Sequence, residues 1–180
     1  VGERNLQSLM NSVVNLIVES FPVIYHAQIF LNDAENQFAV LRASTGERGK
    51  VLLERGHRLE IGSVSVIGQV TDQGQAILAR LSGGTTVHRR NEFLPDTAAE
   101  LAVPLRSSGR IMGALDVQSA DNDGFSDDLV RTIEMLADQI TIAIENVRLY
   151  EETQRLLREM ETTRRSEVQR AWQEYLRARR

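Results

Sequence analysis

Helical periodicity at both ends of the chain encloses two strand–turn–strand segments, and this order constrains the fold more than any other feature. Apolar residues recur at three- and four-residue steps from Leu6 to Val18, which predicts an amphipathic helix that Phe21-Pro22 ends. Alternating runs bounded by turn residues predict strands at 25–31, 37–44, 57–61, 76–81, 100–106 and 110–119. The first two strands and the last two form hairpins, and the second hairpin turns at Ser107-Ser108-Gly109.

Two hairpins around a mixed middle segment are not the alternating order of a parallel α/β fold. We therefore expect an α+β fold with a central antiparallel sheet. The terminal helices would cover one face, and a short helix with loops would form a lid on the other. Ser65 is the expected N-cap of that short helix, and Gly74 its end. A further helical turn is expected within 45–56.

The C-terminal helix should be long, because the sequence contains neither proline nor glycine after Gly124. Ser126 is its expected N-cap. Its apolar stripe follows the 4-3 spacing of a coiled coil through Leu129, Ile133, Leu136, Ile140, Ala143, Val147 and Tyr150. Together with the stripe from Leu6 to Val18, it exceeds what one face of a small sheet needs. We therefore predict a homodimer through the terminal helices.

The amino-acid composition excludes several classes of function. The 180 residues carry a net charge of −4 with a pI near 5.5, so nothing favours binding to nucleic acid. The absence of cysteine excludes disulfides, thiolate catalysis and thioether attachment of a cofactor. No apolar run approaches the ~20 residues of a membrane span, and residues 1–5 do not resemble a signal peptide. We expect a cytoplasmic fragment of a longer protein, with no direct membrane insertion.

Three stretches and the last helix together resemble a GAF domain, a relative of PAS domains. These stretches are 62–70 (GSVSVIGQV), 100–105 (ELAVPL) and 111–119 (IMGALDVQS), followed in the last helix by 143–150 (AIENVRLY). The resemblance covers roughly 21–154. It implies a bacterial signal-transduction protein, phytochrome-like or a sensor kinase. Residues 1–20 would be a signalling helix, 21–150 the sensory domain and 151–180 a linker helix to an output module in the same polypeptide.

The resemblance also implies a pocket on the sheet face opposite the terminal helices. By strand alternation, Ile111, Gly113, Leu115 and Val117 would face those helices. Met112, Ala114, Asp116 and Gln118 would face the pocket, as would His26, Gln28 and Phe30. The segment 62–93 would supply the lid. The expected ligand-binding residues are Gln28, Phe30, Val66, Val70, His88, Arg89, Phe93, Ala114 and Asp116, although a core role suits Phe30 better.

The sequence lacks the residues used by those members of the family whose chemistry is known. The missing cysteine excludes the covalent bilin of phytochromes and the thiol chemistry of the methionine-sulfoxide reductases with this fold. His26, His57 and His88 are too far apart in sequence to indicate a metal or haem site. A partly buried strand position suits His26, and solvated loops suit the other two. Glu100 and Asp116 read as pocket lining or a structural hydrogen bond rather than as a catalytic pair.

These observations favour a non-catalytic sensory domain that binds a small ligand. Ligand binding would shift the packing of the terminal helices. The alternative is a ligand-free dimerisation and spacer module, because a fold does not establish a function.

Overall fold

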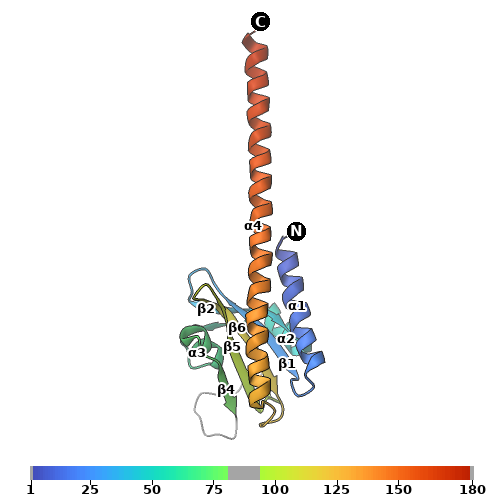
Figure 1. The fold of residues 1–180 in the computed structure, drawn as a ribbon, viewed down its shortest axis with the longest axis vertical. Coiled ribbons are helices and arrows are strands. Elements are labelled where there is room, and N and C mark those ends of the chain that lie inside the picture. The colour runs from blue at the N-terminus through green and yellow to red at the C-terminus, as the bar shows by residue number, and fades with distance from the viewer. Residues whose placement is uncertain (1, 81–93, 179–180) are drawn as a thin grey trace.

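The computed structural model describes residues 2–80 and 94–178, and these form one six-stranded antiparallel sheet with helices on both faces (Figure 1). The strands are β1 (His26–Asn32), β2 (Phe38–Ser44), β3 (Arg58–Glu60), β4 (Ile77–Arg80), β5 (Ala99–Ser107) and β6 (Arg110–Ser119). Their order in the sheet is β3-β2-β1-β6-β5-β4. The first and last hairpins of the sequence therefore meet at the centre, where β1 pairs with β6.

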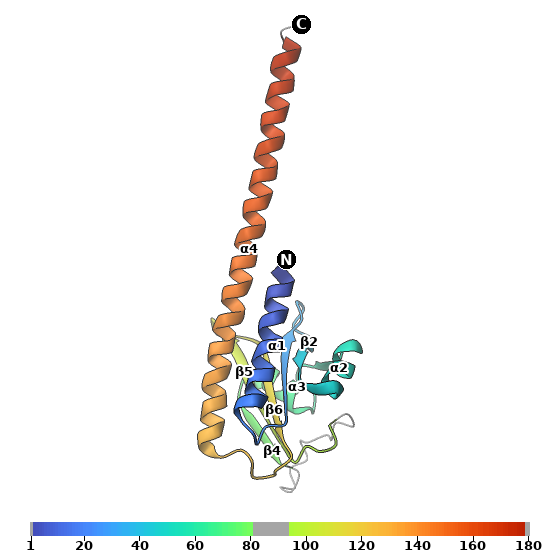
Figure 2. The ribbon, with the colours of Figure 1, turned by 90° about the vertical axis from the view of Figure 1, so that its right-hand side faces the viewer.

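The helices divide between the two faces as the sequence predicted. Helices α1 (Gly2–Ser20) and α4 (Asp127–Ala178) lie on one side of the sheet, and α2 (Gly46–Glu54) and α3 (Val66–Gln73) lie on the other (Figure 2). The predicted α+β architecture is confirmed. Helix α4 continues far beyond the sheet, whereas α1 packs on it along most of its length.

The residues predicted to cap α3 and α4 do so in the structure. The Ser65 side chain accepts a hydrogen bond from the Gly68 N–H at the start of α3, and Gly74 ends the helix with a left-handed φ of 66°. The Ser126 side chain accepts a hydrogen bond from the Leu129 N–H at the start of α4. The strand limits differ from the expected ones by one residue at most ends.

Two apolar clusters fill the two sides of the sheet. On the helix side, Leu115 and Val117 of β6 and Ile29 of β1 pack with Val14 of α1 and Ile133 of α4. On the opposite side, Phe30 and Ala114 pack with residues of α2 and α3. The alternation expected from Gly113 to Gln118 and along β1 is therefore confirmed.

The alternation fails at the start of β6. Gly113 lies opposite Leu105 and Ile111 lies opposite Arg106, so Met112 has no partner on β5 and forms a bulge. Beyond the bulge the faces are exchanged. Met112 packs against the helix-side cluster, whereas Ile111 lies beside Gly74 at the end of α3. The expected orientations of these two residues were wrong, because one inserted residue inverts a two-residue period.

The first part of the apolar stripe of α4 packs against its own sheet. Ile133, Ile140 and Ile144 are buried, and Leu129 and Leu136 pack against the same cluster. The argument that this stripe exceeds the needs of the sheet was wrong for Leu129 to Ile140. The sheet is six strands wide and α4 crosses it beside α1, so this part of the stripe is used within the domain, whereas Tyr150 at its end is 62% exposed.

Gly113 is required by a close approach of two strands. A Cβ there would lie 2.0 Å from the carbonyl oxygen of Phe30 and 2.9 Å from the Cα of Leu31. Gly113 was expected to face the terminal helices, but the neighbour that requires a glycine is the backbone of β1. Because both contacting atoms are backbone, no side-chain rotation can relieve them.

We predict that Gly113→Ala lowers the free energy of unfolding by roughly 2–4 kcal/mol, because it separates the two central strands. Gly56→Ala is the control: it has a φ of 62° but open space around its Cβ, and it should cost about 1 kcal/mol. Urea denaturation of both variants measures the difference. Equal losses would show that β1 and β6 do not need this approach.

Candidate functional site

Polar side chains gather on the sheet face that carries α2 and α3, at the end of the sheet where β1 begins and β6 ends. They are His26 and Gln28 of β1, Ser44 of β2, Glu100 of β5, and Asp116 and Gln118 of β6, and we call them the polar cluster. Strand register brings them together: Gln28 lies opposite both Ser44 and Asp116, and Gln118 lies opposite both His26 and Glu100. Asp116 is only 1% exposed, and Glu100 is partly exposed.

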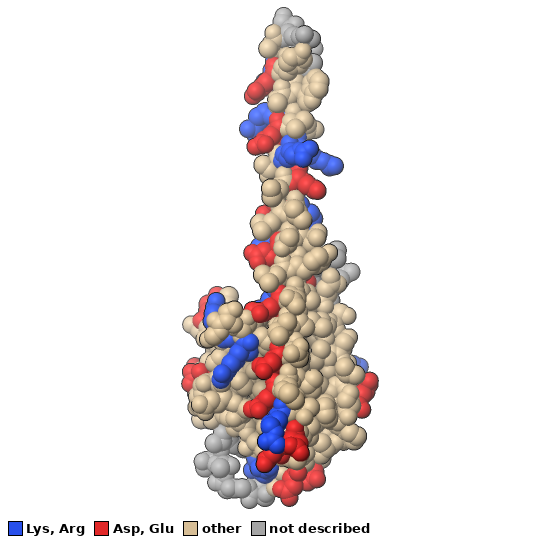
Figure 3. Space-filling view, in the orientation of Figure 1, with Lys and Arg blue, Asp and Glu red and all other residues tan. Residues whose placement is uncertain are grey.

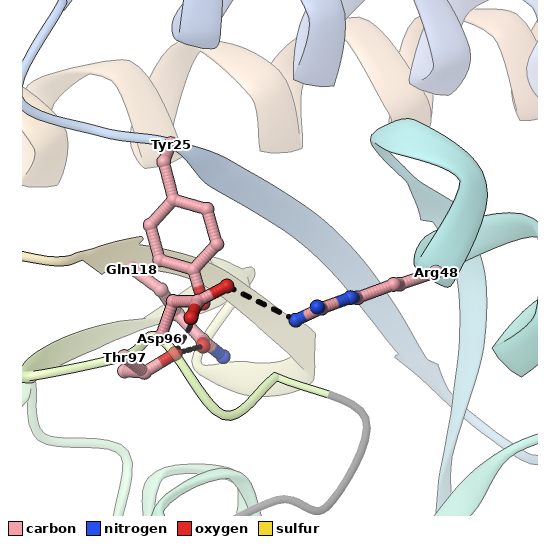
Figure 4. Close-up of polar contacts among 5 residues, drawn as sticks. All are labelled: Tyr25, Arg48, Asp96, Thr97 and Gln118. Atoms are coloured by element: carbon pink, nitrogen blue, oxygen red, sulfur yellow. Dashed lines mark hydrogen bonds and ion pairs between the residues drawn. The ribbon is translucent and has the colours of Figure 1, made fainter.

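Four residues from outside the sheet adjoin this cluster (Figure 4). The Thr97 hydroxyl donates to Oε1 of Gln118 over 2.5 Å. That hydroxyl also lies 2.5 Å from the Tyr25 hydroxyl, which must then be the donor because Thr97 has only one proton. Arg48 of α2 forms an ion pair with Asp96, at 3.2 Å, and so links α2 to the segment before β5.

Asp116 carries the strongest electrostatic perturbation in this cluster. Burial raises its pKa well above the ordinary value, and the nearby Glu100 carboxylate raises it further. The hydrogen bond that Gln118 Nε2 donates to Asp116 Oδ2, at 2.8 Å, acts in the opposite direction. The two acids of the sequence analysis are therefore electrostatic neighbours, and burial of Asp116 beside the Glu100 carboxylate favours the protonated form of Asp116.

His26 is held neutral in the same cluster. Burial lowers its pKa from 6.5 to about 4, and the positive charge of Arg48 adds to the effect. Its ring nitrogens contact the Ser44 hydroxyl at 3.2 Å and the Thr45 hydroxyl at 3.1 Å. His26 lies on a strand as expected, but it is buried rather than partly buried.

The expected ligand-binding residues that the structure describes divide into two groups. Gln28 and Asp116 belong to the polar cluster. Phe30, Val66, Val70 and Ala114 are all buried in one apolar cluster with residues such as Leu41 and Leu52. The lid side chains of α3 are thus already packed against the sheet. His88, Arg89 and Phe93 lie outside the described residues.

Sequence reasoning missed the contributions of Tyr25, Ser44, Arg48, Asp96 and Thr97. Alternation along 37–44 could have placed Ser44 on the pocket side only if the bulge opposite Ile29 and Phe30 had been known. Arg48 could not have been found, because no sequence pattern indicates that α2 lies over the start of β1.

His57 differs from the solvated histidine that was expected. It is half-buried, its ring centroid lies 6.1 Å from that of Phe30 in an edge-on arrangement, and burial lowers its pKa. Within residues 2–80 and 94–178, no three His, Asp or Glu side chains are grouped so that they could hold a metal ion. In the same residues, no helix is both long enough and apolar enough to cross a membrane.

The antiparallel sheet, the paired terminal helices and the polar cluster beneath α2 define a class of regulatory α+β domains. The family model described as GAF domain matches residues 3–145, and the chain belongs to this family. No relative is found among curated protein sequences.

Solved structures with the same fold come from different functional contexts. The GAF domain of a phosphoenolpyruvate-protein phosphotransferase from Coxiella burnetii is 21% identical, with a TM-score of 0.71 over 82% of this chain and 86% of its own. The free methionine-R-sulfoxide reductase from Neisseria meningitidis, solved with its substrate, is 21% identical, with a TM-score of 0.67 over 81% of each chain. The type II enzyme from Thermoplasma acidophilum is 16% identical, with a TM-score of 0.69 over 82% and 97%. At these identities the likeness shows the fold alone.

We predict that His26 makes stability depend on pH between 6.5 and 4. The unfolded chain takes up a proton below pH 6.5 while the folded state resists it, so this contribution is complete above pH 6.5 and is lost towards pH 4. The stability advantage of the wild type over His26→Gln should shrink by no more than about 3 kcal/mol over this window. Asp116 acts in the opposite direction, since its raised pKa lowers stability as pH rises.

Denaturation of the wild type and His26→Gln at a series of pH values measures this change. Because both proteins keep Asp116, its contribution cancels in the comparison. A difference that stays constant from pH 7 to pH 4 would contradict the burial of a neutral His26.

Proposed function

We propose that this GAF domain is a non-catalytic sensory module that binds a small ligand at the polar cluster and relays the change through its terminal helices. One observation carries the proposal. Asp116 is a fully buried acid whose Oδ1 receives no hydrogen bond from the described residues. Such a group costs stability and is rarely kept in a core without a role.

The non-catalytic part of the proposal is supported by the chemistry available at the cluster. The chain has no cysteine, so the thiol chemistry of the reductases with this fold is not open to it. The Ser44 and Thr97 hydroxyls are engaged in hydrogen bonds to His26 and Gln118, and His26 is too weak a base to activate a nucleophile at neutral pH.

A chain of hydrogen bonds supports the relay. It runs from Asp116 to Gln118, from Gln118 to Thr97, and from Thr97 to Tyr25. Tyr25 follows the turn that leaves α1, and its N–H donates to the carbonyl of Gln118 at 3.0 Å. A ligand that withdraws Asp116 from Gln118 would therefore disturb the junction between α1 and β1.

The alternative is a ligand-free dimerisation and spacer module. It is favoured by the apolar half of the expected pocket, which the domain fills with its own Phe30, Val66, Val70 and Ala114. The polar cluster distinguishes the two functions, because a spacer has no need of a buried acid with an unused oxygen.

Hydrogen exchange during ligand screening tests the sensory function. A compound that raises the melting temperature should slow amide exchange in β6 and around Thr97, and it should alter exchange at the end of α1. In Tyr25→Phe, which removes only a hydroxyl, the compound should still bind while the response in α1 falls. A broad screen of nucleotides, amino acids and aromatic metabolites that gives no hit at Asp116 would favour the spacer.

We also propose a homodimer, now through a different face of α4. Met135, Ile142, Leu149 and Leu156 repeat at every seventh residue and are between 50% and 62% exposed. Gln139, Asn146 and Thr153 occupy the alternate positions of the heptad. A seven-residue repeat matches the 3.5-residue period of a coiled coil, and Asn at one core position suits a parallel pair.

Figure 3 shows charged side chains on both sides of the projecting part of α4, and few charges on the surface beside its base. The same stripe on a second copy is self-complementary, as a two-fold interface requires. The pair would bring the two α4 ends together, towards the output module proposed after residue 180.

We predict that Leu149→Glu/Leu156→Glu is monomeric at about 100 µM, a concentration at which a micromolar interface would be saturated. The wild type should be dimeric by light scattering, and Thr162→Glu, elsewhere on the same projecting helix, should stay dimeric. Circular dichroism at low temperature checks that the globular part remains folded. A monomeric wild type would contradict the dimer.

A further inference from the structure

A cavity lies at the end of the sheet opposite the polar cluster. Its volume is about 530 Å³, within the range of small-molecule sites, and residues of the β1–β2 turn, the β5–β6 turn and α4 line it. β1 ends here at Asn32 and β6 begins here at Arg110, whereas the polar cluster holds the other ends of both strands. Figures 1 and 2 show that α4 leaves the sheet at this end. The cavity is therefore separate from the site proposed above.

Asn32 gives the lining of this cavity an unused hydrogen-bond acceptor. Its Nδ2 donates to Asn36 Oδ1 at 2.8 Å and to the carbonyl oxygen of Ile111 at 3.3 Å. Because a backbone carbonyl can only accept, the amide nitrogen of Asn32 must be the atom that faces it. Asn32 Oδ1 is then left buried, with no donor among the described residues. An N–H group of a ligand is the partner that this atom lacks.

The charged residues of the lining are balanced in sign. Arg110 at the start of β6 and Arg148 of α4 are exposed, and no ion pair within the described part of the chain involves either of them. Asp33 of the β1–β2 turn and Glu145 of α4 are partly exposed acids. The two guanidinium groups favour a carboxylate, whereas the acids and Asn32 Oδ1 favour a cationic N–H group. A ligand with a single charge would match only half of this lining.

Glu145 is the acid that is better placed to bind a ligand. Asp33 Oδ1 already accepts hydrogen bonds from the N–H groups of Gln37 and Phe38, which hold the β1–β2 turn. Glu145 accepts a hydrogen bond from the Ser107 hydroxyl through Oε1, so its other oxygen is available to a ligand. The carboxylate of Glu145 and the guanidinium of Arg148 lie one turn apart on α4 and offer opposite charges to the same cavity.

We propose that this cavity binds a free α-amino acid with an apolar side chain. The ligand carboxylate pairs with Arg110 and Arg148, and its ammonium group donates to Glu145 and to Asn32 Oδ1. Met112, which is partly exposed and lines the cavity, contacts the apolar side chain. This inference does not depend on the ligand proposed for the polar cluster, because the two sites share no residue.

Binding at this position would act on α4 directly. Glu145 follows Ile144, after which no described side chain of α4 is buried. The hydrogen bond from Ser107 to Glu145 ties the end of β5 to the helix at this point. An ammonium group on Glu145 competes with Ser107 and weakens that tie where the helix leaves the sheet.

The test uses L-leucine and two analogues that each lack one charge, L-leucinamide and 4-methylpentanoate. Titrations at constant ionic strength and about pH 6.5, where the amino groups are protonated, are followed by NMR of ¹⁵N-labelled protein. L-Leucine should give saturable shifts at the amides of residues 32–36, 108–112 and 145–148, and each analogue should bind about tenfold more weakly. An analogue that binds as tightly as L-leucine, or the absence of saturable shifts at these amides, would overturn the proposal.

Matched variants assign the two charges of the ligand. Arg148→Gln should bind L-leucine and 4-methylpentanoate about tenfold more weakly and L-leucinamide as the wild type does. Glu145→Gln, which keeps an acceptor for Ser107, should weaken L-leucine and L-leucinamide and leave 4-methylpentanoate unchanged. Arg158→Gln, at an exposed position further along α4, is the control and should bind all three as the wild type does. An equal loss for all three compounds in Arg148→Gln and Glu145→Gln would contradict the assignment.

Asp116→Asn separates this site from the polar cluster. It should bind L-leucine with unchanged affinity, because Asp116 lies at the other end of the sheet. If L-leucine instead shifts the amides of residues 116 and 118 and loses affinity in Asp116→Asn, the amino acid binds at the polar cluster. That result would refute the separate amino-acid site while supporting the proposed sensory function.

Discussion

The pairing of β1 with β6 is the interaction on which the rest of the structure depends. It joins the two halves of the chain at the centre of the sheet, and the glycine at 113 allows the backbones to approach. The same pairing fixes which side chains share a face. Ile29 and Leu115 enter the helix-side core, while Gln28 and Asp116 meet on the opposite face. A slip of one residue would put the acid beneath the helices and the leucine in the polar cluster.

The polar cluster lowers the stability of the folded domain. Burial raises the pKa of the Asp116 carboxyl, which favours its protonated form. Burial lowers the pKa of the His26 imidazole, which therefore stays neutral slightly below neutral pH, where a free imidazole takes up a proton. Each shift is free energy that the folded state gives up over part of the pH range. This cost of burying polar groups in the core is consistent with the proposed role of the cluster in binding a ligand.

Most of the fold could be predicted from the sequence, because hairpin turns, caps and apolar periods are local signals. Ser65, Gly74 and Ser126 act as the sequence indicated. The errors have a common physical origin in tertiary contacts. The bulge at Met112 inverts a local alternation, and the width of the sheet decides that Ile133 and Ile140 face inwards. At the site, the alternation of side chains along the strands predicted Gln28 and Asp116. Arg48 and Thr97 lie on segments whose position depends on the tertiary fold, so no local pattern predicts them.

The two faces of the sheet are not independent, and this would give the proposed sensory function a physical route. Asp116 and Val117 are adjacent residues of β6, so a shift of the strand that accommodated a ligand on one face would move the apolar contacts of α1 and α4 on the other. Packed cores respond to such shifts by changing between discrete arrangements rather than by deforming smoothly. Helix α4 bears on β5 as well as β6 and then leaves the domain as a continuous helix to Ala178. A small movement at the base of α4 would therefore be transmitted along the continuous helix. In the proposed dimer, a partner helix on the Met135–Leu156 stripe would convert it into a change of register or angle between the two subunits.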